Sequence, residues 1–171
     1  AARKVIDMPG IKSVTINIGG DIVVLGEGKE VVSISNPLAD AENDLPIAKI
    51  SIGNKAVATS GNYRRGFMIN GKWYSHIIDP RSGMPAGKVI SATVVAKNAT
   101  DARALATAFN VLEPAEGMQR ANSIQGTEYL VITKEGERYE SKGWHALELK
   151  SSKSADITDV QNPEIDQLQK S

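Results

Sequence analysis

The sequence has 171 residues, enough for one domain with a substantial buried core. Lys plus Arg and Asp plus Glu number 20 each, so no net charge draws the chain toward nucleic acid or an anionic membrane. It contains no cysteine, which excludes disulfides, thiolate metal sites and cysteine nucleophiles. There is no apolar run of the roughly 20 residues that a spanning helix needs, and no basic-then-apolar leader, so we expect a cytosolic chain, a mature secreted one or a fragment.

Short strands dominate the first part of the chain. The expected strands, rich in β-branched residues and often bounded by Gly, Asn or Pro, are residues 13–18, 22–25, 30–35, 47–52, 66–69, 73–78 and 89–96. Gly19 and Gly20 lie between the first two, either as a tight bend or as a point where a ligand approaches the backbone closely. Residues 58–65 (ATSGNYRR) are interpreted as a small polar turn followed by an aromatic residue and two cations.

The periodicity then becomes helical. Residues 100–112 predict a helix whose Leu105 and Ala108 face the sheet while Arg103 faces a cleft or solvent. A second short helix is expected to begin at Pro114, and residues 128–133 and 137–141 are the last two expected strands. The fold class is therefore α+β, an antiparallel or mixed sheet with helices packed on one face.

Two expectations concern the C-terminal part of the chain. His145, beside Trp144, is interpreted as a strand-end residue without polar companions. Residues 150–171 are rich in Ser, Lys and Asp and are predicted to be a poorly ordered tail, which leaves residues 1–149 as the domain.

Residues 74–83 (YSHIIDPRSG) hold the strongest candidate site. His76 lies three residues before Asp79, which opens an Asp-Pro turn that ends at a glycine. Together with the hydroxyls, glycine amides and arginines of residues 58–65, these groups could hold a phosphorylated ligand and move a proton beside it. Two ordinary surface turns remain the alternative.

Five motifs in order carry a resemblance to a known family: NIGGDI at 17–22, NP at 36–37, ATSGNYRR at 58–65, SHIIDPRSGMP at 75–85 and ALATA at 104–108. The series resembles the C-terminal half of the ApbE family of flavin transferases and covers roughly residues 1–145. The resemblance implies an ApbE-like, T-fold-like α+β domain that lacks the usual N-terminal half, with residues 1–7 at the end of the family's central helix. It also implies a periplasmic or membrane-associated location, although no lipobox cysteine is present.

The resemblance implies a magnesium-dependent enzyme that binds FAD. Members transfer FMN to a Thr or Ser of a target protein, or hydrolyse FAD to FMN and AMP. By this analogy His76 is the base or proton shuttle, since imidazole exchanges protons near neutral pH, and Asp79 orients it or contacts the flavin. The other implied ligand contacts are Gly19, Gly20, Asp21, Ser60, Gly61, Tyr63 and Arg64. We expect these loops to converge on one concavity.

Two departures from the family pattern qualify the magnesium site. Thr107 matches a threonine that helps to hold the metal, but Arg103 stands one helical turn before it, where the family has an aspartate. A guanidinium cannot ligate Mg²⁺, and Asp101 lies about 200° away around the helix. Arg103 is therefore expected to contact phosphate directly in place of the metal, or to mark a non-catalytic flavin- or nucleotide-binding module. The other departure is length, since members of the family are usually longer. The chain is a naturally shortened member, a fragment of a longer chain or one part of a composite flavin cleft, and its short length favours the non-catalytic module.

Overall fold

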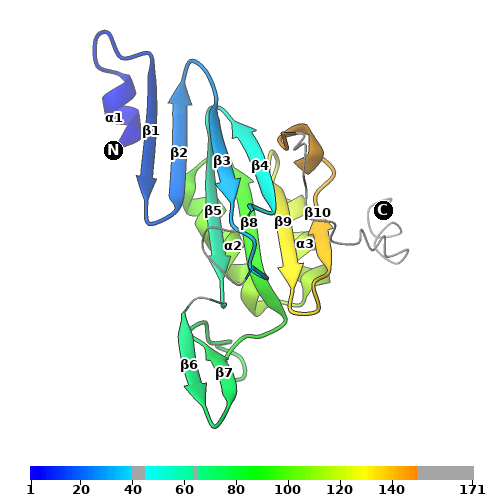
Figure 1. Ribbon diagram of the computed structural model, residues 1–171. Coiled ribbons are helices and arrows are strands. Elements are labelled where there is room, and N and C mark those ends of the chain that lie inside the picture. The colour runs from blue at the N-terminus through cyan, green and yellow to red at the C-terminus, as the bar shows by residue number, and fades with distance from the viewer. Residues whose placement is uncertain (40–44, 64, 150–171) are drawn as a thin grey trace.

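The computed structural model describes residues 1–39, 45–63 and 65–149 (Figure 1). The helices are α1 (Ala2–Ile6), α2 (Ala99–Val111), α3 (Pro114–Asn122) and the 3-10 turn η1 (Trp144–Ala146). The strands are β1 (Ser13–Ile18), β2 (Asp21–Gly26), β3 (Glu30–Ile34), β4 (Ala48–Ile52), β5 (Lys55–Gly61), β6 (Gly66–Ile69), β7 (Lys72–Ser75), β8 (Val89–Ala96), β9 (Glu128–Thr133) and β10 (Arg138–Glu140). The predicted tail at 150–171 lies outside the described residues. No described helix combines the length and the apolar character needed to cross a bilayer.

The main sheet has six strands in the order β1-β2-β5-β8-β9-β10, and every neighbouring pair is antiparallel. Two further antiparallel pairs, β3–β4 and β6–β7, lie outside it. Figure 1 shows α2 and α3 behind this sheet and β3–β4 in front of it. The α+β prediction, with helices on one face, is confirmed.

Strand β5 corrects the interpretation of residues 58–65 as a turn. Residues 58–61 form the second half of this strand, which pairs with β2 on one side and with β8 on the other. The Thr59 side chain is satisfied across the sheet: the hydroxyls of Thr59 and Thr93 lie 2.9 Å apart. A Thr-Ser-Gly segment can therefore continue a strand, because its pairing with β8 outweighs the weak strand preference of Ser and Gly.

Each face of the sheet has its own core. On the face toward α2, Ala92 and Val94 of β8 pack with Leu105 and Phe109, while Val95 belongs to the cluster beneath β3–β4 on the opposite face. Strands covered on both faces carry nearly continuous apolar runs, as β8 does. Leu105 faces the sheet as predicted, whereas Ala108 is only half-buried and Phe109 makes the deeper contact.

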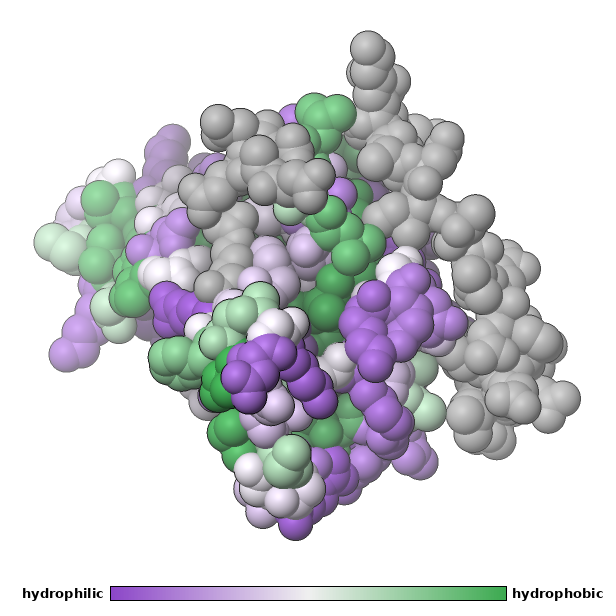
Figure 2. Space-filling model, turned by 60° about the horizontal axis from the view of Figure 1, so that its bottom comes forward, coloured by the Kyte–Doolittle hydropathy of each residue, from purple (hydrophilic) through white to green (hydrophobic). Residues whose placement is uncertain are grey.

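The β6–β7 hairpin projects from the lower end of the sheet (Figure 1). Asn70 and Gly71 at its tip both have positive φ, 49° and 74°, which is typical of a two-residue type I′ turn. Strand β7 ends at Ser75 rather than continuing to Ile78, which forms only an isolated bridge with Pro85. Figure 2, with this end turned forward, shows hydrophobic and hydrophilic residues side by side on the exposed surface.

Candidate functional site

A cavity of ≈ 390 Å³ lies between the β1–β2 turn, β3, the end of β5 and the base of the β6–β7 hairpin. The structure brings seven of the predicted site residues into its lining: Gly19, Gly20, Ser60, Gly61, Tyr63, His76 and Arg103. These residues are separated by up to 84 positions in the sequence, from Gly19 to Arg103. Ser60 and His76 therefore share one concavity, as the prediction required.

The β1–β2 turn forms one wall of the cavity. Gly19 and Gly20 have φ of 61° and 94°, a left-handed conformation that side-chain-bearing residues rarely adopt. A Cβ added to either glycine would have no heavy atom within 4 Å, so the space beside this backbone is open. The amide of Gly20 already donates to Asn17 Oδ1 at 3.0 Å. The glycine pair is thus a tight two-residue turn that also leaves room for a ligand.

The end of β5 forms a second wall, and its geometry depends on Gly61. A Cβ at Gly61 would lie 2.8 Å from the carbonyl oxygen of Ile90 and 2.8 Å from the Tyr63 ring. The next residue, Asn62, is buried and donates from Nδ2 to the Val89 carbonyl at 2.8 Å. Sequence reasoning did not select Asn62, although it ties this wall to the start of β8.

His76 follows β7 and returns to the start of the hairpin. Its backbone amide donates to the Arg65 carbonyl at 3.2 Å, and its Nδ1 lies 2.9 Å from the same oxygen. Because a carbonyl can only accept, Nδ1 must carry the hydrogen in this contact. Nε2 is then the proton-accepting atom of the neutral ring. The contact therefore leaves Nε2 as the nitrogen that can accept a proton as a general base.

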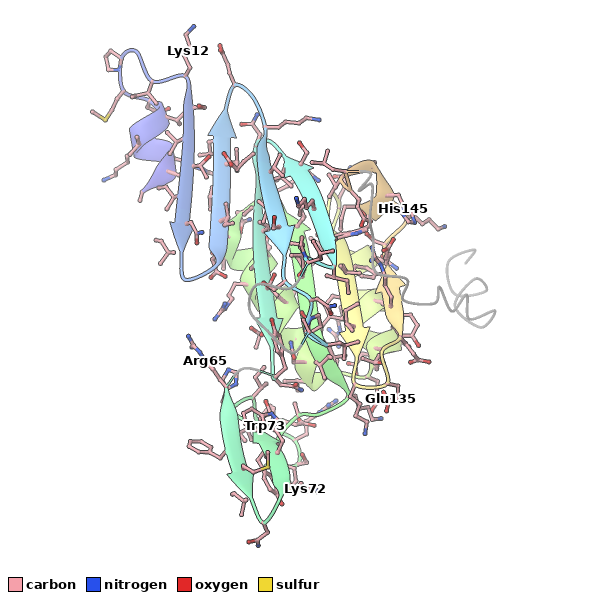
Figure 3. The ribbon with its side chains drawn as sticks, viewed as in Figure 1. Lys12, Arg65, Lys72, Trp73, Glu135 and His145 are labelled. Carbon is pink, nitrogen blue, oxygen red and sulfur yellow. The ribbon has the colours of Figure 1, made fainter. Side chains whose placement is uncertain are left out.

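Arg65 is a cavity residue that the predicted set lacked, since Arg64 was selected instead. Figure 3 shows the Arg65 side chain extending from the start of β6, away from the hairpin. Arg64 lies outside the described residues. The pair of adjacent arginines indicated a cation here, and the Arg65 side chain supplies one to the cavity.

Arg103 reaches the same cavity from α2. Its Nη1 donates to Asp21 Oδ1 at 3.1 Å, and Asp21 is the residue that follows the Gly19-Gly20 turn. Asp21 was predicted to contact the ligand, but it is not among the lining residues and its carboxylate instead binds Arg103. Thr107 is exposed one turn further along α2 and is also absent from the lining. Asp101 accepts a hydrogen bond from Asn98 at 2.7 Å, away from the cavity as expected.

Asp79 does not orient His76, which corrects that part of the prediction. Its carboxylate accepts hydrogen bonds from the backbone amide and the guanidinium of Arg81, at 2.9 to 3.0 Å. These bonds lower the pKa of Asp79 below its ordinary value. It lines a second hollow of ≈ 320 Å³, together with Lys88 and Glu113. The three-residue spacing failed as a guide because the His76 ring turns back to the Arg65 carbonyl, whereas the Asp79 carboxylate binds Arg81 on the other side of Pro80.

His145 also differs from its interpretation as an isolated strand-end residue. It lies in the 3-10 turn η1 (Figure 3). Its Nε2 is 3.1 Å from Glu140 Oε2. Glu148 lies close to the same group. These polar companions come from a strand and a loop on either side of η1, so neighbouring sequence letters did not reveal them as a cluster.

Comparison with known proteins gives a consistent result. The ApbE family model matches residues 1–131. The chain is 36% identical over 143 residues to an FAD:protein FMN transferase of Klebsiella pneumoniae, covering 81% of this chain and 40% of the relative. A Vibrio cholerae FAD:protein FMN transferase is 38% identical over 121 residues, covering 68% and 36%.

Solved structures show the same similarity. The crystal structure of the ApbE protein from Thermotoga maritima superposes with a TM-score of 0.69 at 30% identity, over 81% of this chain and 45% of that one. The flavin transferase ApbE from Vibrio cholerae superposes with a TM-score of 0.65 at 28% identity, over 85% and 47%. The chain thus spans less than half the length of the relatives that it matches.

Proposed function

The chain belongs to the ApbE family, and from that premise we propose that it binds FAD and transfers FMN from it to a hydroxyl of another protein. With water in place of that hydroxyl, the same site hydrolyses FAD to FMN and AMP. One observation carries the proposal: the Gly19-Gly20 turn, His76 and two arginines converge on one cavity. The arginines are Arg65 and Arg103. Cations and open backbone suit a diphosphate, and an imidazole suits activation of a hydroxyl.

The proposed reaction breaks the phosphoanhydride bond of FAD and forms a new bond from its flavin-side phosphorus to the acceptor oxygen. The acceptor oxygen, from a Thr or Ser side chain or from water, forms a bond to the phosphorus on the flavin side. The bond from that phosphorus to the bridging oxygen breaks, and AMP leaves with the bridging oxygen. The acceptor proton passes to His76 Nε2, the atom that the Arg65 contact leaves as acceptor. The arginines offset the phosphate charge during this exchange.

Magnesium is the metal that family resemblance implies, and the described lining residues do not fit it. Mg²⁺ takes hard oxygen ligands, chiefly carboxylates and water. The described part of the lining has no Asp or Glu, and it brings the guanidinium groups of Arg65 and Arg103 instead. The nearby carboxylate of Asp21 already binds Arg103. The proposed reaction therefore assigns no step to a metal.

The flavin cleft is proposed to be completed by another polypeptide segment, in this protein or in a partner. The curated relatives that the chain matches are more than twice as long as the matched region. The acceptor protein is a further proposed partner, which must present a Thr or Ser at the cavity.

The test is to incubate the protein with FAD, with and without an acceptor protein, and to separate FAD, FMN and AMP by chromatography. We expect FMN and AMP in equal amounts without acceptor, and a flavin-labelled acceptor by mass spectrometry when one is present. His76→Gln should lower the rate by roughly a hundredfold or more while FAD binding persists. If the native protein binds FAD but forms no AMP, with or without an acceptor protein, the domain is a flavin-binding module and the enzymatic proposal fails.

A further inference from the structure

The cavity is cationic, and this charge carries an inference about how it holds phosphate. Among the described residues that line it, Arg65, Arg103 and His76 are the ionisable groups that can be positive, and none is a carboxylate. A site built for a bound divalent cation needs the opposite composition. The lining is therefore complementary to an anion rather than to a metal ion.

Arg103 has spare hydrogen-bonding capacity. A guanidinium offers five N–H donors in a rigid fork. Among the described residues, the Arg103 side chain makes one hydrogen bond, from Nη1 to Asp21 Oδ1 at 3.1 Å. About half of the Arg103 side chain is exposed, 52% against 28% for Asp21. The remaining donors are available to a ligand in the cavity.

Asp21 sets where the Arg103 charge lies. It follows directly on Gly19 and Gly20, whose missing side chains leave open space in the cavity that Arg103 also lines. Arg65 lines the same cavity from the base of β6, and its guanidinium has no hydrogen-bond or ion-pair partner in residues 1–39, 45–63 and 65–149. Two guanidinium groups thus border a space beside exposed backbone. Their charge matches the diphosphate of a dinucleotide, which carries one negative charge on each phosphate.

We infer that the cavity binds the diphosphate of FAD directly through Arg103 and Arg65, without a divalent cation, and that Asp21 is a positioning residue for Arg103. This inference rests on the proposed function. It assigns to two side chains the charge neutralisation that a metal would otherwise supply. It predicts flavin and nucleotide binding that neither Mg²⁺ nor a chelator changes.

The experiment measures dissociation constants for FAD, ADP and riboflavin by calorimetry, each in excess Mg²⁺ and in chelator. FAD and ADP should bind with constants that agree within about twofold in the two conditions. Arg103→Gln should weaken both by about tenfold or more, because it removes a charge-assisted contact to phosphate. Riboflavin has no phosphate, so its affinity should not change. Arg120→Gln, on the exposed surface of α3, is the matched control and should change none of them.

Two further variants separate positioning from charge. Arg65→Gln should weaken FAD and ADP binding as Arg103→Gln does, and it serves if that variant does not fold. Asp21→Asn keeps an oxygen acceptor for Arg103 while removing a negative charge, so FAD should bind roughly threefold more tightly. Asp21→Leu removes the negative charge and also the acceptor that positions Arg103, so it should not show the tighter FAD binding of Asp21→Asn. Thermal unfolding of every variant confirms that the fold is retained.

The outcomes distinguish this inference from the proposed function. FAD binding that appears only with Mg²⁺, or that both Arg103→Gln and Arg65→Gln leave unchanged, overturns the inference and leaves the flavin-transfer proposal standing. Absence of FAD binding in both conditions overturns the two together.

Discussion

The guanidinium of Arg138 lies between two carboxylates and is largely withdrawn from water. It contacts Glu140, and its Nη2 donates to Glu148 Oε2 at 3.0 Å. Only 15% of the Arg138 side chain and 12% of the Glu140 side chain are exposed. Burial opposes the charged form, but the two carboxylates outweigh it and raise the pKa of Arg138 above its ordinary value. The pair ties β10 to the segment after η1.

Arg138→Ala should lower the free energy of unfolding by about 3 kcal/mol, because it leaves the buried Glu140 carboxylate without its guanidinium partner. Chemical denaturation measures this change. Arg120→Ala, whose partner Glu116 lies on the surface of α3, is the control and should cost less than about 1 kcal/mol. Equal losses in the two variants would show that burial does not strengthen the Arg138 contacts.

Tyr129 predicts an alkaline limit to stability. It is fully buried in β9 beneath α2, where burial raises the pKa of its hydroxyl above the ordinary value. Below about pH 10 both the folded and the unfolded protein keep this proton, so the contribution is constant. Above that pH the unfolded chain releases the proton first, and the free energy of unfolding falls as pH rises.

Denaturation curves between neutral pH and pH 11 should therefore show a loss of stability that Tyr129→Phe reduces. Tyr139→Phe, at a half-buried position, is the comparison and should reduce it less. A pH dependence that is identical in the native protein and in Tyr129→Phe would contradict the assignment.

The β6–β7 hairpin has cavity residues at its two ends and exposed hydrophobic residues between them. Arg65 and His76 at its two ends line the cavity, while Phe67 and Met68 between them are 72% and 64% exposed. Trp73 fastens the hairpin by donating from Nε1 to the Asn62 carbonyl at 2.9 Å. The position of both cavity residues therefore depends on an element that shares little of the two cores.

Phe67→Ser should change the free energy of unfolding by less than about 0.5 kcal/mol, since an exposed side chain loses little contact. Trp73→Phe should cost about 1 kcal/mol, because it removes a hydrogen bond to the backbone. Both are measured by chemical denaturation. A loss above about 2 kcal/mol in Phe67→Ser would show that this side chain is packed in solution.

The molecule as a whole is a sheet with a separate core on each face. Ile50 of β4 is fully buried beneath the β3–β4 hairpin, and Phe109 of α2 is buried against the opposite face. Alternate residues of β8 and β9 serve the two cores, so neither core can be lost while the sheet remains intact. We expect the two to unfold together.

Ile50→Ala should cost about 2–5 kcal/mol and Phe109→Ala about 3–5 kcal/mol, each from the cavity that it leaves. Circular dichroism and tryptophan fluorescence should follow one coincident transition in both variants. Separate transitions in Ile50→Ala would show that the β3–β4 hairpin unfolds alone.

Local pattern was sufficient for most elements and for the family. The helix α2 and strands such as β1 and β8 were predicted within one or two residues, because their periodicity and turn residues act over short distances. Seven site residues that the motifs indicated do line one cavity. Hydrophobic alternation and motif order are properties of the chain itself, so they can be recognised without coordinates.

Long-range pairing settled the features that local pattern misassigned. Residues 58–61 have the composition of a turn, yet they continue strand β5 because residues 91–94 of β8 supply partners along their whole length. Asp79 is three positions from His76 but binds Arg81. Arg103 binds the carboxylate of Asp21, although the two residues are 82 positions apart. Side chains meet according to how the backbone is paired and turned in space. That arrangement depends on contacts between distant segments, which no short window of sequence contains.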